Sequence, residues 1–138
     1  MKRAALLVSS SLVVGIALGV IGTGVLTAQQ EPAKRTVLLT ADLAGIAGKR
    51  ATVYRAEFAP GASGDKHRHP VDTFVYVLDG TVTLEEEGKG PRTVNAGEVI
   101  QEVPTGIYKT TNASMTSPAT LLVVSLGEKD QPFAVPVK

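Results

Sequence analysis

After residue 35, apolar and polar residues alternate in short segments, many of them rich in β-branched side chains. A period of two is typical of a strand with one buried face, and no stretch in this part keeps helical spacing. Asp42–Ala47 has room for one helical turn at most. The predicted strands are Thr36–Thr40, Ala51–Phe58, Thr73–Leu78, Thr81–Glu86, Glu98–Val103, Ile107–Thr111, Thr120–Leu126 and Phe133–Val137.

Turn residues separate these segments at regular intervals. Asp79-Gly80 predicts a tight hairpin between the two strands that flank it. In Thr73–Leu78 both alternate sets of side chains are mostly apolar, which predicts a central strand covered on both faces. Seven or eight short strands with little helix predict an all-β fold, either an antiparallel sandwich or a barrel.

The beginning of the chain has a different composition. Lys2 and Arg3 precede an uncharged run from residue 4 to 28 that ends in Leu26-Thr27-Ala28, a tolerable cleavage site for an export signal. The run is also long enough for an uncleaved membrane anchor, because about 20 apolar residues span a bilayer. A buried helix of the fold is the third alternative. The basic start places the N-terminus in the cytoplasm in either membrane case.

These features predict three segments: a signal peptide or anchor at 1–28, a polar linker at 29–35, and a β-barrel domain at 36–138. A cleaved signal predicts a periplasmic or secreted domain. An uncleaved one predicts an inner-membrane protein that faces the periplasm and contacts the membrane only through residues 4–28.

Composition narrows the chemistry. With 138 residues the chain fits one domain, and 14 Lys+Arg against 13 Asp+Glu give no reason to expect a nucleic-acid partner. The absence of Cys excludes disulfides, thiol nucleophiles, iron–sulfur clusters and Cys-ligated zinc. Histidines, carboxylates, lysines and hydroxyls remain to carry function.

The only two histidines, His67 and His69, are two residues apart. On an extended segment their side chains point to one face, so both imidazoles can reach one metal ion. Imidazole suits manganese, iron, nickel and zinc alike. Such a pair is also compatible with two neutral histidines that are hydrogen-bonded inside a pocket without metal.

The spacing of Gly61, His67, His69 and Gly80 resembles the first conserved block of the cupin superfamily. The second block is echoed by Gly97, Pro104, Gly106 and Asn112, although Asn112 falls one residue early. The resemblance covers roughly Leu38 to Leu126. It implies a double-stranded β-helix, or jelly-roll barrel, with a ligand pocket inside one end and a homodimeric assembly.

The chain departs from the family pattern at two ligand positions. Thr73 stands where metal-binding cupins carry the Glu of the first block, and Lys109 stands where they carry the His of the second. Two protein ligands rarely hold a divalent ion firmly, and an inward ammonium group would repel one. Asp72 supplies a third ligand if the strand register shifts by one residue, and otherwise caps its loop.

The same positions describe a pocket for a small anionic molecule. His67, His69, Thr73, Tyr108 and Lys109 combine directional hydrogen bonds with one positive charge, as a carboxylate ligand would need. The alternative to a ligand-binding role is that Lys109 is an ordinary surface lysine on an edge strand.

Three hypotheses follow. The favoured one is an exported cupin that binds a small molecule, with weak or residual metal binding (Mn, Fe, Ni or Zn) at His67, His69 and Asp72. The second is a cupin enzyme, either a metal-dependent oxygenase or isomerase or a metal-free one using histidine as acid and base. The third is a non-catalytic dimeric scaffold.

Overall fold

The computed structural model describes residues 33–138, which form ten β-strands and no helix. The predicted leader at 1–28 lies outside the described residues, so the expectation of a signal peptide or anchor is not addressed by the fold. Within residues 33–138 the structure has no helix with the length and hydrophobicity to cross a membrane. The strands are β1 (Lys34–Asp42), β2 (Lys49–Phe58), β3 (His67–Arg68), β4 (Thr73–Asp79), β5 (Thr81–Glu86), β6 (Arg92–Asn95), β7 (Val99–Glu102), β8 (Tyr108–Asn112), β9 (Ala119–Glu128) and β10 (Val135–Pro136).

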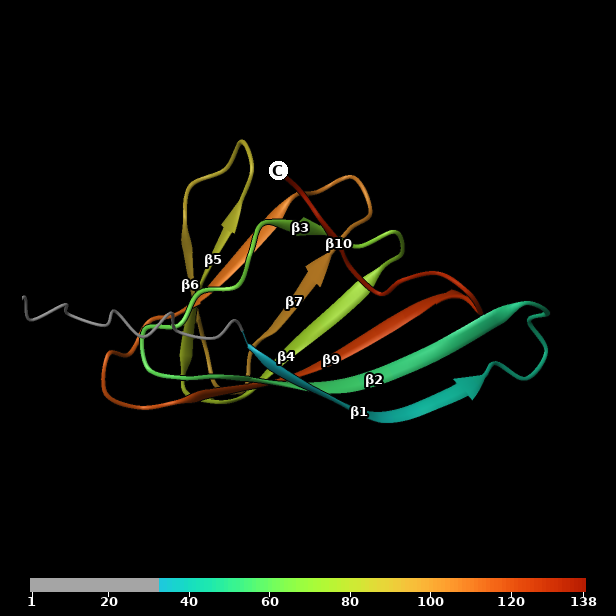
Figure 1. The fold of residues 1–138 in the computed structure, drawn as a ribbon, viewed down its shortest axis with the longest axis horizontal. Helices are drawn as coiled ribbons and strands as arrows, with labels where there is room; N and C mark the ends of the chain where they lie inside the picture. The colour runs from blue at the N-terminus through green and yellow to red at the C-terminus, as the bar shows by residue number, and fades with distance from the viewer. Residues whose placement is uncertain (1–32) are drawn as a thin grey trace, which may run out of the picture.

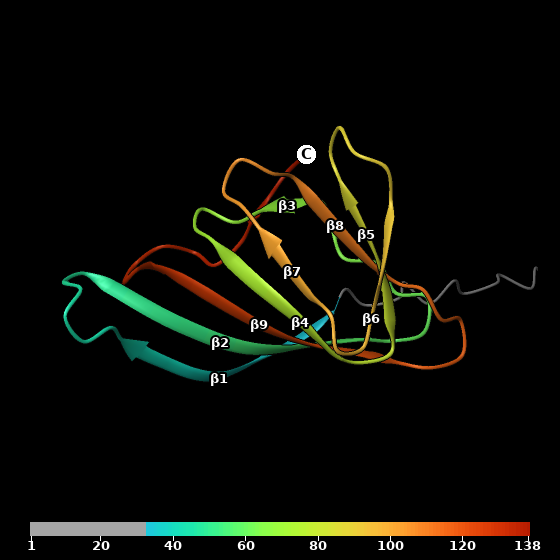
Figure 2. The same ribbon diagram turned by 180° about the vertical axis from the view of Figure 1, so that it is seen from behind.

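The strands form two five-stranded sheets that pack face to face (Figures 1 and 2). The first sheet has the order β1-β2-β9-β4-β7 and the second has the order β10-β3-β8-β5-β6, with antiparallel pairing throughout. Such a sandwich of two antiparallel sheets is the double-stranded β-helix that the strand pattern and the family resemblance predicted, and the fold class is confirmed.

Alternation along the strands builds the core between the sheets. In β5, Val82 and Leu84 are buried, as their shared face predicted, and in β4 the residues Thr73, Val75 and Val77 point inward. The buried apolar side chains form a single cluster, to which both sheets contribute. Burial of these apolar side chains supplies most of the driving force for folding. It also fixes which face of each strand can line an internal site.

Two details of the strand prediction are wrong. The strand at 73–78 is central in its sheet, between β9 and β7, but its outer side chains Phe74, Tyr76 and Leu78 are exposed. Asp79-Gly80 does not close a hairpin, because β4 and β5 belong to different sheets. Gly80 has φ 81°, and a Cβ there would lie 2.9 Å from the Pro118 carbonyl oxygen, so the turn carries the chain between the sheets where only glycine fits.

Several shorter features were not predicted. β3 and β6 are absent from the expected strands, and β1 begins at Lys34, so Arg35 belongs to the sheet rather than to the linker. Asp42–Ala47 forms turns and no helix. Asn112, from the second family block, is buried: its amide donates to the carbonyls of Ala59 and Ser117 at 3.0 and 2.8 Å, and so anchors the loop before β9.

Candidate metal centre

The two histidines lie at the end of the sandwich where the short strand β3 joins the second sheet. His67 pairs with Tyr108 of β8 on one side and with Pro136 of β10 on the other. His69 follows directly after β3 and keeps the extended spacing, so both imidazoles turn toward the interior. The ring centroids are 5.0 Å apart at an interplanar angle of 89°, and the predicted convergence of the pair is present.

A carboxylate from the other sheet completes the group. Glu102 is the last residue of β7, and it shares the inner face of that strand with the buried Ile100. Directly opposite Glu102 in the sheet is Thr73, which in turn lies opposite Ser125 of β9. The carboxylate therefore comes from the strand next to Thr73, at the same level, where a longer side chain reaches the histidines.

We call His67, His69 and Glu102 the inner cluster. Glu102 Oε2 lies 2.8 Å from His69 Nε2 and 3.7 Å from His67 Nε2. One candidate ligand atom from each residue lies within 4.8 Å of the others. His69 and Glu102 are each only 2% exposed, and His67 is partly exposed. The three groups therefore meet almost entirely out of bulk water.

Backbone carbonyls fix both imidazole rings. His67 Nδ1 lies 2.9 Å from the Asp65 carbonyl oxygen, and His69 Nδ1 contacts the carbonyl of Phe133. A carbonyl only accepts, so each Nδ1 carries the hydrogen and donates it. In neutral histidines this leaves the lone pairs on the Nε2 atoms, which face Glu102. Hydrogen bonds of this kind orient histidine ligands at metal sites.

A cation would stabilise the inner cluster electrostatically. Burial raises the pKa of Glu102, but its contacts with His67 and His69 outweigh burial and the pKa lies below its usual value, so the carboxylate is ionised. Burial lowers the pKa of His67, but the Glu102 carboxylate and the Asp65 carbonyl outweigh it and the pKa is raised. A negative charge and two nitrogen lone pairs thus share one buried point, where a proton or a metal ion relieves their repulsion.

The surroundings of the Glu102 carboxylate also suit a metal ion. Glu102 Oε2 is buried, and its near neighbours are the Nε2 atoms of His69 and His67, at 2.8 and 3.7 Å, with which it makes no well-aligned hydrogen bond. A buried carboxylate oxygen beside two imidazole nitrogens is stabilised by a cation between them or by protons on the imidazoles. Two imidazoles and one carboxylate are also a donor set that zinc, iron, nickel and manganese accept.

The inner cluster borders a small cavity of about 40 Å³ between the sheets. Its walls combine apolar side chains, among them Val75, Leu121 and Val123, with the inner cluster and the polar side chains of Arg35 and Tyr54. Burial raises the pKa of Tyr54, so its phenol stays protonated at neutral pH. A volume of this size holds an ion with one or two water molecules, or a ligand of a few atoms.

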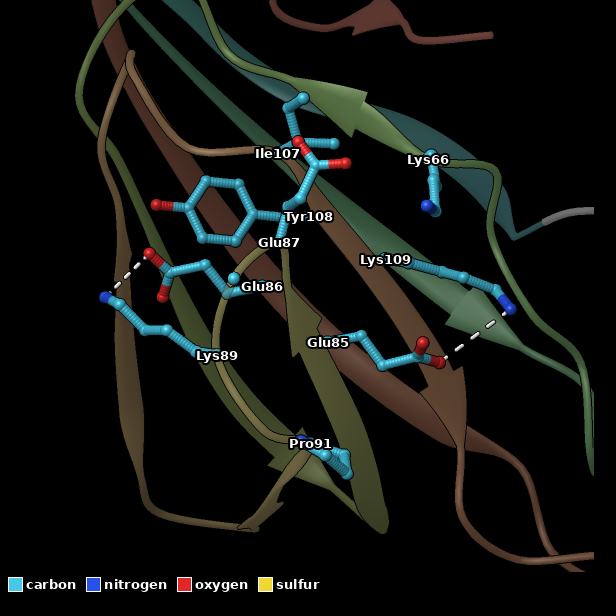
Figure 3. Close-up of a pocket in the computed structure, with 10 residues that line it drawn as sticks. Lys66, Glu85, Glu86, Glu87, Lys89, Pro91, Ile107, Tyr108 and Lys109 are labelled. Carbon is cyan, nitrogen blue, oxygen red and sulfur yellow. Dashed lines mark ion pairs between the residues drawn. The ribbon is translucent and has the colours of Figure 1, made fainter.

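The structure places the other predicted site residues differently. Lys109 does not point toward the histidines, because in β8 the inward positions belong to Tyr108 and Thr110. Its ammonium group faces Glu85 at 3.8 Å on the outside of the second sheet (Figure 3). It is a surface lysine, but on a strand inside the sheet and not at an edge.

Lys109 lines a separate hollow of about 270 Å³, which we call the outer pocket; its walls are Lys66, Glu85, Glu86, Glu87, Gly88, Lys89, Pro91, Ile107, Tyr108 and Lys109 (Figure 3). The Tyr108 side chain is almost fully buried, and its hydroxyl accepts a hydrogen bond from the Val103 amide at 2.9 Å. Neither Tyr108 nor Lys109 lines the cavity beside the histidines.

Asp72 does not supply the third ligand of the inner cluster. Its carboxylate accepts a hydrogen bond from Gln101 at 3.3 Å on the exposed face, because the register shift on which the Asp72 alternative depended is absent and Thr73 keeps the inward position. Thr73 lies beside the cluster, where its hydroxyl contacts Ser125 Oγ at 3.0 Å. The inward residue that sequence reasoning missed is Glu102. The sequence did carry one indication of its role: in the predicted strand Glu98–Val103, Glu102 alternates onto the same face as the apolar Ile100.

Comparison with known proteins agrees with this architecture. A family model described as a cupin domain matches residues 54–125. A search of curated proteins found no match. Among solved structures, a cupin-like protein from Thermotoga maritima is 23% identical, with a TM-score of 0.60 over 75% of this chain and 74% of that one.

Two further structures have the same fold. A protein with a double-stranded β-helix domain from Klebsiella pneumoniae is 18% identical, with a TM-score of 0.61 over 78% of this chain and 86% of its own. The DMSP lyase DddQ from Ruegeria pomeroyi is 19% identical, with a TM-score of 0.62 over 84% of this chain and 57% of its own. Identities this low establish a shared fold and leave the activity open.

Proposed function

Since the chain belongs to the cupin superfamily, we propose that it holds a divalent transition-metal ion at His67, His69 and Glu102 and binds a small molecule in the adjoining cavity. The buried Glu102 carboxylate, which meets the Nε2 atoms of two oriented imidazoles, carries this proposal. Three protein ligands are the number that catalytic metal sites use, and they leave coordination positions open to a small molecule. The structural neighbour named as a DMSP lyase lends support to an enzymatic role.

Each residue has a distinct part in this proposal. The carbonyls of Asp65 and Phe133 hold the imidazoles in the tautomer that presents Nε2. Glu102 supplies the negative charge. Val75, Leu121 and Val123 supply apolar wall beside the inner cluster. A bound divalent ion would supply Lewis acidity, which polarises an oxygen atom of the small molecule.

Export and dimerisation stay predictions. The exposed apolar side chains Phe74, Tyr76, Leu78 and Val99 on the outer face of the first sheet support a dimer, because apolar patches of this kind mark association surfaces. Export rests on the sequence of the first 28 residues, with its basic start, its uncharged run and the predicted cleavage site at Ala28.

The proposal is tested by metal analysis of the full-length protein, purified without a histidine tag. We expect close to one equivalent of manganese, iron, nickel or zinc in the wild type, or uptake of one equivalent after incubation. His67→Ala/His69→Ala should take up none, whereas Asp72→Asn, outside the inner cluster, should match the wild type. A wild type that remains metal-free after incubation with all four ions would overturn the proposal.

A further inference from the structure

Residues 129–138, which we call the C-terminal strap, connect the two sheets. The strap leaves β9 in the first sheet and runs to β3 in the second sheet, where β10 pairs with it (Figures 1 and 2). In the sheet order β10-β3-β8, the strap is the outer neighbour of the short strand that contains His67 and leads into His69. The end of the chain therefore lies directly against the segment that carries both candidate metal ligands from the second sheet.

Each of the four residues from 66 to 69 has a partner in the strap. The pairs are Lys66 with Val137, His67 with Pro136, Arg68 with Val135, and His69 with Phe133. Two of them are hydrogen bonds: the Val137 amide donates to the Lys66 carbonyl at 2.9 Å, and His69 Nδ1 donates to the Phe133 carbonyl. On its other side, β3 pairs with β8 through one residue pair. The positions of both imidazoles therefore depend on the strap.

The strap itself is weakly attached. None of its ten residues is buried, and seven of them are exposed. Its ladder with β3 has two residue pairs, and Pro136, in one of them, has no N–H to donate. Segments with few buried apolar contacts and exposed backbone open at a low cost in free energy. Docking of the strap is thus an equilibrium that one additional interaction can shift.

Phe133 anchors the strap to the rest of the domain. Its side chain packs against the buried core cluster, and its ring centroid lies 4.9 Å from that of Tyr54. The guanidinium carbon of Arg35 lies 5.9 Å from the same ring centroid. Because the backbone carbonyl of Phe133 accepts from His69, release of the ring would also withdraw the group that fixes the His69 tautomer.

We propose that docking of the C-terminal strap and metal binding at the inner cluster stabilise each other. This inference rests on the proposed function, because it needs a metal ion at the inner cluster. The docked strap holds both Nε2 atoms toward Glu102, so the ion binds the docked form more tightly. A bound ion in turn fixes the imidazoles against which the strap docks.

Thermodynamic linkage makes the two effects equal in size. The factor by which docking raises the metal affinity is also the factor by which metal raises the equilibrium constant for docking. Loss of a hydrogen bond that orients a histidine ligand typically lowers metal affinity by about 10- to 100-fold. We therefore expect zinc to favour the docked strap by a factor in this range.

Hydrogen exchange of the full-length protein, followed by mass spectrometry with and without saturating Zn²⁺, measures docking of the strap. We expect Zn²⁺ to slow exchange at least tenfold in peptides that cover residues 133–138. β6 (Arg92–Asn95) is the matched control, because it forms the opposite edge of the same sheet, and its exchange should not change. Unchanged exchange of the strap in the zinc-bound protein would overturn the inference, and so would equal slowing at both edges.

Phe133→Ala tests the anchor, because it removes the ring and keeps the backbone carbonyl. We expect its Zn²⁺ affinity in calorimetric titration to fall by about 10- to 100-fold and its strap to exchange faster in the presence of Zn²⁺. Phe133→Tyr keeps the ring and should retain most of the affinity. Val135→Ala, at an exposed position of the strap, should bind Zn²⁺ like the wild type. Wild-type Zn²⁺ affinity in Phe133→Ala would contradict the coupling.

The two proposals fail in different ways. If the wild type binds no Zn²⁺, the proposed function fails, and this inference fails with it. If Zn²⁺ binds at the inner cluster and the strap does not respond, the proposed function stands and the coupling alone is wrong.

Discussion

The inner cluster and the outer pocket differ in size and in charge balance, and the smaller one is the better candidate site. The outer pocket measures about 270 Å³ and gathers three lysines and three glutamates (Figure 3). Lys89 pairs with Glu86 at 2.7 Å and Lys109 with Glu85 at 3.8 Å, all with access to solvent. The cavity at the inner cluster measures about 40 Å³, yet on its wall a buried carboxylate meets two imidazole nitrogens.

The contrast shows that uncompensated buried charge is a stronger functional indication than pocket volume. Charges in water cost little and pair weakly, whereas a buried charge persists only if something in the native state stabilises it. The outer pocket needs no ligand to satisfy its charges. The inner cluster does, and four predictions follow from that difference, in order of decreasing effect.

The largest effect is expected from removing the buried negative charge. Glu102→Gln keeps the shape of the side chain but leaves two imidazoles alone, and we expect its Mn²⁺ or Zn²⁺ affinity in calorimetric titration to fall at least 100-fold. Glu85→Gln in the outer pocket is the matched control and should bind like the wild type. Equal losses of metal affinity in both variants would mean that the ion is attracted by the overall surface charge and not held by Glu102.

Metal should also stabilise the folded protein. At a free concentration one hundred times the dissociation constant, the free energy of unfolding rises by about 2.7 kcal/mol, which raises the melting temperature by roughly 10 °C. Differential scanning calorimetry with and without a chelator measures this shift. A shift that persists in Glu102→Gln would place the ion elsewhere.

The affinity for metal should rise with pH through neutrality. The pKa of His67 is raised above 6.5, so below that raised pKa a proton occupies the apo centre and metal must displace it. Each displaced proton makes affinity change about tenfold per pH unit. Glu102, with its lowered pKa, is already ionised in this range and adds no dependence. An affinity that is constant between pH 6 and 8 would contradict this role of His67.

The smallest effect is expected in the outer pocket. Lys109→Ala removes an exposed ion pair, and such pairs contribute about 0–1 kcal/mol to the free energy of unfolding. Chemical denaturation should therefore show a nearly unchanged midpoint, and metal affinity should equal that of the wild type. A clear loss of metal or ligand binding in Lys109→Ala would mean that Lys109 takes part in binding, against this account.

Much of the fold could be predicted from the chain, because alternation reports directly on which side chains are buried. Val82 and Leu84 show this well, and the family spacing around His67 and His69 pointed to the same architecture. The exposed face of β4 was not predictable in the same way. Apolar residues such as Phe74 and Tyr76 give the same sequence pattern whether another layer of the protein covers them or they stay exposed.

The site was predictable only in its local part. Two histidines at i and i+2 share a face in any extended segment, so their convergence follows from the sequence. Glu102 is 33 residues beyond His69 in the numbering, and its approach depends on β7 lying next to β4, which alternation within a strand cannot reveal. Lys109 was misplaced for a related reason: the family spacing gave its position, but the inward residue of β8 is the neighbouring Tyr108.

X-ray absorption spectroscopy of the Zn²⁺-loaded full-length protein tests the central claim most directly, because it counts the ligands of the bound ion. Since the chain has only two histidines, the account predicts two imidazole nitrogens at roughly 2.0–2.1 Å and at least one oxygen at roughly 2.0–2.2 Å. The Glu102→Gln protein at the same zinc concentration should lose this spectrum. A wild-type spectrum of hydrated zinc without imidazole scattering would contradict the account.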